Sequence, residues 1–360
     1  MERFWGISGR GNIDSALDIH ASQHAFNEVR EYIERLTWDG VPRLDTLFID
    51  YLGAKDTAYN RAVCRKSFTA AVTRAMTPGY KYDNMVILAG PQGIGKSTLL
   101  DKMSRGWFND SIRTFEGKDA SELLQGVWLV EVSELDAFRK TDVARIKQFL
   151  SLRADRYRAA YGRHVSELPR QCVFFGSTNT TDFLQDTTGN RRFWPVDVGE
   201  QSHTKTVWRD LTDDVIDQLW AEAKARWQAG ESLYLSGDVE QEAKIKQEEH
   251  REVSAREGLI AAFVEKQVPV DWAKWPIDRR RDYWCGATRT PDGQELELVD
   301  RDRIAAVEVW CELFNGNVRE MKPADTREIN AILARLDGWK RSGTVIRVGP
   351  YSVQRGFVRA

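Results

Sequence analysis

The sequence has few cysteines, no long hydrophobic run and no large excess of charge of one sign. Its four cysteines (Cys64, Cys172, Cys285 and Cys311) are far apart and form no C-x-x-C pair, which argues against a zinc site and a disulfide framework. No apolar run approaches the roughly 18 residues needed to span a bilayer, and the N-terminus lacks the apolar core of a signal peptide. We therefore expect a cytoplasmic protein with no membrane partner.

The length and composition are those of an ordinary globular protein. With 360 residues the chain is long enough for two or three cores, since single cores rarely grow beyond roughly 250–300 residues. Hydrophobic residues make up 42%, charged residues make up 29%, and the formal net charge is −2. This charge creates no global basic field, so any binding to nucleic acid would have to come from local patches.

The sequence divides into four expected segments, and the first three differ in their expected secondary structure. Residues 1–82 are expected to form a helical region for assembly, and residues 201–257 a charged helical connector. Between them, residues 83–200 alternate helical stretches with short apolar runs. Those runs are "MVILAG", "VWLVEV", "CVFFGSTN" and "RFWPVDV". Such alternation is typical of a parallel sheet covered by helices, so we expect an α/β fold here.

The fourth segment, residues 258–360, combines helices with a hairpin. Two helices are expected over "RDRIAAVEVWCELF" and "DTREINAILARLDGW", followed by a hairpin with its turn near Gly349 and Pro350. This order suggests a winged-helix-like domain. It would place a helix in the DNA major groove, set its hairpin against the DNA backbone, or serve as a protein–protein module. The three arginines at 279–281 are interpreted as a solvated run.

One segment matches a phosphate-binding pattern in full, because "GPQGIGKS" fits G-x-x-x-x-G-K-[ST]. In this pattern glycines let backbone N–H groups turn toward phosphates, and the following helix adds its positive N-terminal end. Lys96 is expected to reach the β- and γ-phosphates of ATP, and the Ser97 hydroxyl to bind Mg²⁺. The residues predicted to bind the nucleotide are Gly90, Pro91, Gln92, Gly93, Ile94, Gly95, Lys96, Ser97 and Thr98.

Two glutamates accompany the next apolar run, in "GVWLVEVSEL". A nucleotide site that hydrolyses its ligand needs an acid at the end of a second strand. We assign Glu131 to the Mg²⁺ shell and Glu134 to polarising the attacking water. The two roles could be exchanged, and Glu134 could be structural.

The third apolar run ends at Asn179, where ligands bind in open α/β sheets. Asn179 could orient the water or contact the γ-phosphate, or it could cap a turn. Arg191 and Arg192 then open a further strand. An arginine that reaches the nucleotide of a neighbouring subunit accelerates transfer by roughly 10³–10⁵. Adjacent strand residues point to opposite faces, so one arginine should act this way, with Arg192 slightly favoured, and the other should form a structural salt bridge.

In this order the motifs resemble the virulence-associated protein E family of phage and mobile-element ATPases, which is similar to the superfamily 3 helicases of the AAA+ class. The resemblance is carried by "WDGVPRLD", "RKSFTAAVTRAMTPGYKYDNMVILAGPQGIGKSTLL", "VWLVEVSELD", "PRQCVFFGSTNTTDFLQDTTGNRRFWPV" and, more weakly, "GWKRSGTVIRVGPYSVQRGF". It implies an AAA+-like P-loop ATPase core over residues 83–200 in a ring-forming, DNA-translocating protein of a phage or prophage replication module. Fuller members often carry a primase domain upstream, and no primase activity is expected of this chain.

Residues 151–170, between the second and third motifs, are rich in arginine. Five arginines and one histidine stand there against two acids, with two tyrosines among them. A basic hairpin with aromatic residues suits single-stranded DNA, through phosphate pairing and base stacking. In the helicases that the sequence resembles, a hairpin at this place projects into the channel of the ring. Arg163 and His164 are candidates for its tip and Arg158 for the rising strand. The alternative is an arginine-rich subunit interface.

The sequence therefore predicts an ATP-driven DNA helicase or translocase, with ATP and Mg²⁺ as cofactors, that acts as a homo-oligomeric, hexameric ring on single-stranded DNA. A replication protein is a further candidate partner. The alternative is a switch-type ATPase that assembles with a protein partner, for replication initiation or element defence, without unwinding DNA. A nucleotide kinase is disfavoured, because it would need neither an arginine acting between subunits nor a basic hairpin.

Overall fold

A computed structural model of the protein describes residues 10–23, 26–134, 140–157, 166–184, 190–251, 255–286 and 296–360. The chain divides into two compact units, the first ending at Arg251 and the second running from Glu252 to Ala360. The first unit contains the predicted helical region, the predicted sheet and most of the predicted connector, whose last six residues (252–257) belong to the second unit. None of the described helices has the length and apolar character needed to cross a membrane.

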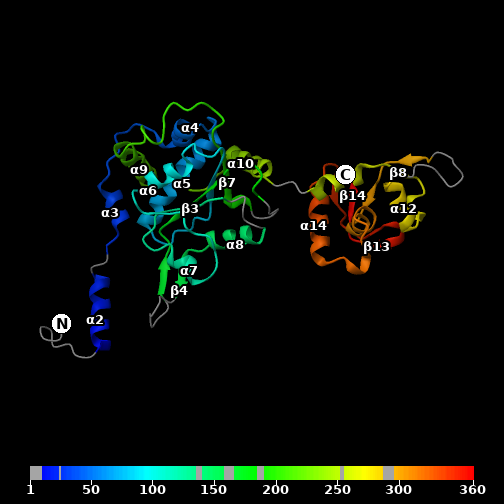
Figure 1. The fold of residues 1–360 in the computed structure, drawn as a ribbon, viewed down its shortest axis with the longest axis horizontal. Coiled ribbons are helices and arrows are strands. Elements are labelled where there is room, and N and C mark those ends of the chain that lie inside the picture. The colour runs from blue at the N-terminus through cyan, green and yellow to red at the C-terminus, as the bar shows by residue number, and fades with distance from the viewer. Residues whose placement is uncertain are drawn as a thin grey trace. The chain divides into compact units, whose positions relative to one another are not determined.

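The first unit alternates helices with short strands (Figure 1). Its α-helices are α2 (Arg10–Gln23), α3 (Glu28–Arg35), α4 (Leu47–Leu52), α5 (Ala58–Met76), α6 (Lys96–Ser104), α7 (Gly117–Glu122), α8 (Lys140–Leu150), α9 (Asp213–Gln228) and α10 (Gly237–Glu249). Its strands are β1 (Met85–Ala89), β2 (Phe108–Asn109), β3 (Leu129–Val132), β4 (Ala154–Tyr157), β5 (Ser166–Pro169), β6 (Val173–Thr178) and β7 (Phe193–Asp197).

Five of these strands form one parallel sheet, in the order β2-β3-β6-β1-β7. Strand β1 lies between β6 and β7, with Ala89 opposite Thr178 on one side and Asp197 on the other. Because all five strands run the same way, their carboxyl ends share one edge of the sheet. The predicted α/β class with a helix-covered parallel sheet is confirmed.

Helices pack on both faces of this sheet, so its strands are apolar on both sides. Along β1, Val86 and Leu88 contribute to a core that includes α5, α6 and α9. Met85, Ile87 and Ala89 contribute to a second core with α7 and α8. A strand buried on both faces has no polar side to alternate with, which explains the continuous apolar run of β1.

Two stacked tryptophans join α9 to the sheet. The ring centroids of Trp128, just before β3, and Trp220, on α9, are 3.9 Å apart. The indole N–H of Trp220 donates to the Met103 carbonyl at 2.8 Å, and that of Trp128 donates to the Ala71 carbonyl at 3.0 Å. Both rings are fully buried, and both polar groups are satisfied, so the pair adds apolar burial without an unpaired donor.

The hairpin predicted over residues 151–170 is present at its base, where β4 and β5 pair antiparallel with Ala154 opposite Pro169. Figure 1 shows β4 extending away from the central sheet. Its connecting residues lie outside the described part of the chain, and they include Arg158, Arg163 and His164.

The arginines at the base of the hairpin are engaged within the protein. Arg170 is buried and donates to both carboxylate oxygens of Asp155, at 2.7 and 2.8 Å. Arg156 forms an exposed ion pair with Glu167 at 3.4 Å. Arg170, which contributed to the basic charge of the predicted hairpin, therefore anchors that hairpin and is not available to DNA.

The second unit is a separate helical body with short antiparallel strands. Its helices are α11 (Ala255–Glu265), α12 (Ile277–Trp284), α13 (Ala306–Glu308), which continues into a π-helix (Val309–Leu313), and α14 (Pro323–Leu333). Its strands are β8 (Val268–Pro269), β9 (Leu298–Val299), β10 (Arg303–Ile304), β11 (Trp339–Arg341), β12 (Ile346–Arg347), β13 (Val353–Gln354) and β14 (Phe357–Arg359). Strands β12 and β13 form the predicted hairpin around Gly349 and Pro350.

The three arginines at 279–281 are not a solvated run, and this interpretation was wrong. Arg280 is buried on α12, and its guanidinium donates to Glu308 at 3.1 Å and Glu312 at 2.8 Å. Arg281 donates to the carbonyls of Cys311 and Gly316. The acids that neutralise Arg280 lie about 30 residues further along the chain, and local sequence does not reveal such a partner.

We predict that Trp220→Ala lowers the free energy of unfolding by about 3–5 kcal/mol, because it removes a fully buried indole and leaves a cavity against Trp128. Urea unfolding followed by circular dichroism measures the change. The matched control is Trp208→Ala, at a side chain that is 58% exposed, which should change stability by less than about 1 kcal/mol. Equal losses for the two variants would contradict this description of the core.

Candidate functional site

The carboxyl ends of β1, β3 and β6 meet around one cavity. The backbone N–H of Gly90, after β1, donates to the carbonyl of Thr178, at the end of β6, at 3.2 Å. The cavity has a volume of about 370 Å³. It is lined by Gln92, Gly93, Gly95, Lys96, Ser97, Thr98, Ser133, Glu134, Ser177, Thr178, Asn179 and Trp208.

The loop between β1 and α6 needs glycine at two positions for different reasons. At Gly90, a Cβ atom would lie 2.3 Å from the carbonyl oxygen of Val198, so no side chain fits. Gly95 precedes α6 with a φ of +97°, a left-handed conformation that other residues rarely adopt. Together the two glycines let the chain turn sharply from the sheet into the first turn of α6 and leave the backbone of the loop accessible.

Lys96 is the first residue of α6, and its side chain folds back over the loop. Its Nζ donates to the carbonyls of Gly90 at 2.6 Å and Pro91 at 2.9 Å, and to Oδ1 of Asn179 at 3.1 Å. Burial lowers the pKa of Lys96, against the opposing attraction of Glu131. The ammonium group is thus held by three neutral oxygens, and an anion in the cavity would be a stronger partner.

Glu131 connects three elements of the site. It is a residue of β3, and its Oε1 accepts from the hydroxyl of Ser97 on α6 at 2.7 Å and from that of Ser177 on β6 at 2.5 Å. The side chain is almost completely buried, and its second oxygen, Oε2, has no hydrogen-bond partner among the described residues. An unpaired carboxylate oxygen in such a place is costly unless a ligand satisfies it.

These residues fit a magnesium ion that brings most of its own ligands. The described part of the chain has no cluster of three histidine, cysteine, aspartate or glutamate side chains. Mg²⁺ is usually held by one or two protein oxygens together with water and phosphate oxygens. Ser97 and the free oxygen of Glu131 could supply the two protein oxygens.

Glu134 lies on the rim of the cavity with an unusual backbone conformation. Its φ is +54°, in the left-handed region that is uncommon for residues other than glycine. The side chain is exposed and lines the cavity. Such conformations are enriched at functional sites, where the surrounding structure holds them in place.

The segment that follows Asn179 is tied to the end of the first unit by His250. The ring Nδ1 of His250 lies 2.6 Å from the carbonyl oxygen of Thr181, and Nε2 lies 2.9 Å from Oδ1 of Asp197. Lys246 also contacts Asp197, at 3.0 Å. Burial alone would lower the pKa of His250, but Asp197 and the carbonyl of Thr181 outweigh it, and the pKa is raised.

Arg191 and Arg192 lie at the opposite edge of the sheet from the cavity. They immediately precede β7, where Phe193 is level with Met85 at the start of β1. The five residues of β1, roughly 17 Å, separate that level from the glycine loop, and the arginines lie one and two residues before it. At about 20 Å, neither arginine reaches the cavity of its own chain. Figure 1 shows β7 beside the core helices of the first unit.

The two arginines differ in their surroundings. The Nε atom of Arg192 lies 3.0 Å from the hydroxyl of Ser151 and 3.4 Å from a carboxylate oxygen of Asp83. Arg191 is exposed, and among the described residues its guanidinium makes no hydrogen bond or ion pair. Both line a second cavity of about 310 Å³ beneath α10.

The structure brings most of the predicted nucleotide residues together. Gln92, Gly93, Gly95, Lys96, Ser97, Thr98, Glu134 and Asn179 line one cavity, and Glu131 lies directly behind Ser97. Gly90 and Pro91 accept from Lys96, whereas Ile94 packs against the core. Sequence reasoning assigned no role to Ser133, Ser177, Thr178 and Trp208. The first three adjoin predicted residues, but Trp208 follows a different strand and has no motif around it.

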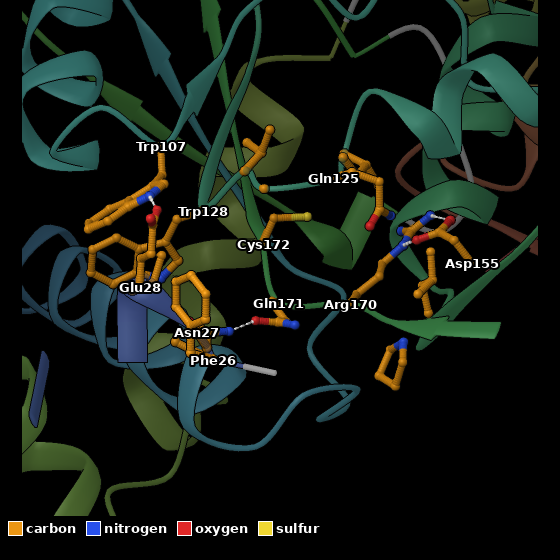
Figure 2. A pocket seen from close by; sticks show the side chains of 17 residues that line it. Phe26, Asn27, Glu28, Trp107, Gln125, Trp128, Asp155, Arg170, Gln171 and Cys172 are labelled. Carbon is orange, nitrogen blue, oxygen red and sulfur yellow. Dashed lines mark hydrogen bonds and ion pairs between the residues drawn. The ribbon is translucent and has the colours of Figure 1, made fainter. Parts of the chain in front are cut away.

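A third cavity, of about 330 Å³, opens at the amino ends of β3 and β6, away from the glycine loop. Several of its polar side chains bond to one another. Figure 2 shows Asn27 turned toward Gln171, and Arg170 toward Asp155. Since these groups are already paired, the cavity offers less to a polar ligand than the one around Lys96.

A family model described as a virulence-associated protein E-like domain matches residues 33–252, which is more than half of the chain. No curated protein matches the sequence.

Solved structures of the NrS-1 C-terminal region are similar to the chain. The apo structure of this region is 13% identical with a TM-score of 0.47, and covers 91% of this chain and 78% of its own. A structure described as its A form is 12% identical with a TM-score of 0.46 and the same coverage. Similarity this low carries no functional information.

We predict that His250→Gln destabilises the protein more at low pH than at high pH. A raised pKa in the folded state means that the stabilisation by His250 is complete below the unfolded value, near 6.5, and is lost as pH rises through the folded value. Thermal unfolding between about pH 6 and pH 9 measures the difference between wild type and variant. The exposed His203 supplies a matched control, His203→Gln. A difference that grows with pH would contradict the assignment.

Proposed function

The chain belongs to the virulence-associated protein E-like family, and from that premise we propose that it is an ATP-driven DNA helicase or translocase that acts as a homo-oligomeric ring in the replication module of a phage or mobile element. The observation that carries the proposal is the meeting of Lys96, Ser97, Glu131 and Asn179 at one edge of the sheet. A glycine loop, a lysine, a hydroxyl and a buried carboxylate are the groups that bind and hydrolyse a magnesium–nucleotide complex.

Each group has a role that follows from its position. The loop backbone and Lys96 bind the phosphates, and Lys96 exchanges its carbonyl partners for phosphate oxygens. Ser97 and Glu131 would hold Mg²⁺, and the bound ion would supply positive charge against the phosphates. Glu134, on the rim, polarises the attacking water, and Asn179 fixes its position near the γ-phosphate.

The position of the two arginines supports a site shared between subunits. Because they lie about 20 Å from the loop of their own chain, an arginine that stabilises the transition state must come from a neighbouring copy. Arg192 is held by Asp83 and Ser151, which is the structural role expected of one member of the pair. We therefore assign the role between subunits to Arg191.

The hairpin built by β4 and β5 is the candidate DNA contact. The buried ion pair of Arg170 and Asp155 fixes its base, so the segment with Arg158, Arg163 and His164 is carried by a defined support. The second unit, with α14 and the hairpin of β12 and β13, has the elements of a winged helix and offers a further contact with DNA or with a protein.

The switch-type ATPase remains the second candidate, for a specific reason. On the described strands of the hairpin, Arg156 pairs with Glu167 and Arg170 pairs with Asp155, so these strands carry no excess of positive charge. The remaining basic character would come from Arg153, which donates to the carbonyl of Gly79, and from the connecting residues. The two functions differ in whether DNA accelerates hydrolysis.

We predict that Lys96→Ala abolishes ATP hydrolysis, because the variant lacks the ammonium group that binds the β- and γ-phosphates. Lys118→Ala is a matched control, since Lys118 is a solvent-facing residue of α7 that pairs only with Glu122 among the described residues. Release of inorganic phosphate by the purified proteins measures the effect. Normal hydrolysis by Lys96→Ala would refute the site.

We predict that Arg191→Ala lowers the rate of hydrolysis by at least about 10³-fold while ATP still binds. Arg192→Ala should mainly lower stability, through the lost contact with Asp83. Mixing inactive Arg191→Ala with inactive Lys96→Ala should restore part of the activity. Mixed rings would contain sites in which an Arg191→Ala subunit supplies Lys96 and its Lys96→Ala neighbour supplies Arg191. If Arg192→Ala shows this complementation and Arg191→Ala does not, the assignment is reversed.

A further inference from the structure

Trp208 is an exposed indole on the rim of the nucleotide cavity. It lies in the segment between β7 and α9, more than 100 residues after the glycine loop, yet it lines the same cavity as Gly95 and Lys96. Its side chain is 58% exposed. Among the described residues, no aromatic ring or cationic group stacks on it, which leaves its face open to a ligand.

The backbone that carries this ring is held firmly from α6. The ammonium group of Lys102 donates to three carbonyls of the segment, those of Val207 at 2.8 Å, Trp208 at 3.3 Å and Leu211 at 3.2 Å. Val207 is completely buried. Because the backbone is already fixed, a ligand would have to order only the side chain of Trp208, which has two rotatable bonds.

The ring also touches the glycine loop itself. A Cβ atom built on Gly95 would lie 3.4 Å from Cη2 of Trp208 and 3.1 Å from the side chain of Val207. The absence of a side chain at Gly95 therefore lets the indole approach the loop closely. The distal edge of the ring therefore borders the loop that would hold the phosphates, while the side chain as a whole is largely exposed.

We propose that Trp208 is the surface on which the base of the bound nucleotide stacks, and that it gives the site a preference for purine nucleoside triphosphates. This inference rests on the proposed function, since it requires the triphosphate to occupy the glycine loop. Aromatic side chains stack on any base, because every base has a π-face. A purine overlaps the indole over a larger area than a pyrimidine does, and the preference follows from that area.

Three ligands separate stacking from phosphate binding: ATP, CTP and inorganic tripolyphosphate, which has no base. With Mg²⁺ present, Trp208→Ala should bind ATP roughly 5- to 150-fold more weakly than wild type, the range that stacking on an aromatic ring supports. Its affinity for tripolyphosphate should be unchanged, and its preference for ATP over CTP should shrink. Trp208→Phe keeps a ring for stacking and should recover most of the affinity for ATP.

Isothermal titration of the full chain measures all three ligands, and circular dichroism verifies that the variants are folded. If Trp208→Ala binds ATP as tightly as wild type does, or loses ATP and tripolyphosphate equally, Trp208 is not the stacking surface, while the glycine-loop site still stands. If wild type binds neither ATP nor tripolyphosphate, the proposed function itself fails, and the inference with it.

Discussion

The buried carboxylate of Glu131 is the interaction on which the site depends. From β3 it accepts hydrogen bonds from Ser97 on α6 and Ser177 on β6, so it fixes three elements that are far apart in the sequence. Its second oxygen is buried and unpaired among the described residues, at a cost of about 1–3 kcal/mol. The fold thus keeps one acceptor open where the proposed cation would bind, and the parallel sheet places that acceptor beside the glycine loop.

The same sheet separates the proposed nucleotide-binding residues from the arginine proposed to act on a neighbouring subunit. Lys96 and Glu131 lie at its carboxyl edge, whereas Arg191 lies beyond its amino edge. One chain therefore carries the proposed nucleotide site at one end and the exposed Arg191 at the other. In the proposed ring, a second copy would bring the two ends together, so that hydrolysis would depend on assembly. His250 lies next to Arg251, the last residue of the first unit. Its ring bonds to Thr181, so it connects the end of the first unit to the segment that follows Asn179.

Sequence patterns predicted the features that are local. The glycine loop and the apolar strands were recognisable because each is determined by a few consecutive residues. Three features could not be predicted, because they depend on contacts across the fold. The burial of Arg280 is set by glutamates about 30 residues further along the chain. The ion pair of Arg192 is set by Asp83, and the position of Trp208 by Lys102. No local pattern signals such partners.

The most direct test of the central claim is the rate of ATP hydrolysis by the full chain with and without single-stranded DNA, over a range of salt concentrations. A DNA-driven motor should hydrolyse ATP faster when DNA is present. The stimulation should fall steeply as the salt concentration rises. At high salt, the counterions that DNA binding releases contribute less favourable free energy. Hydrolysis that is indifferent to DNA at every salt concentration would contradict the motor and favour a nucleotide-dependent assembly switch.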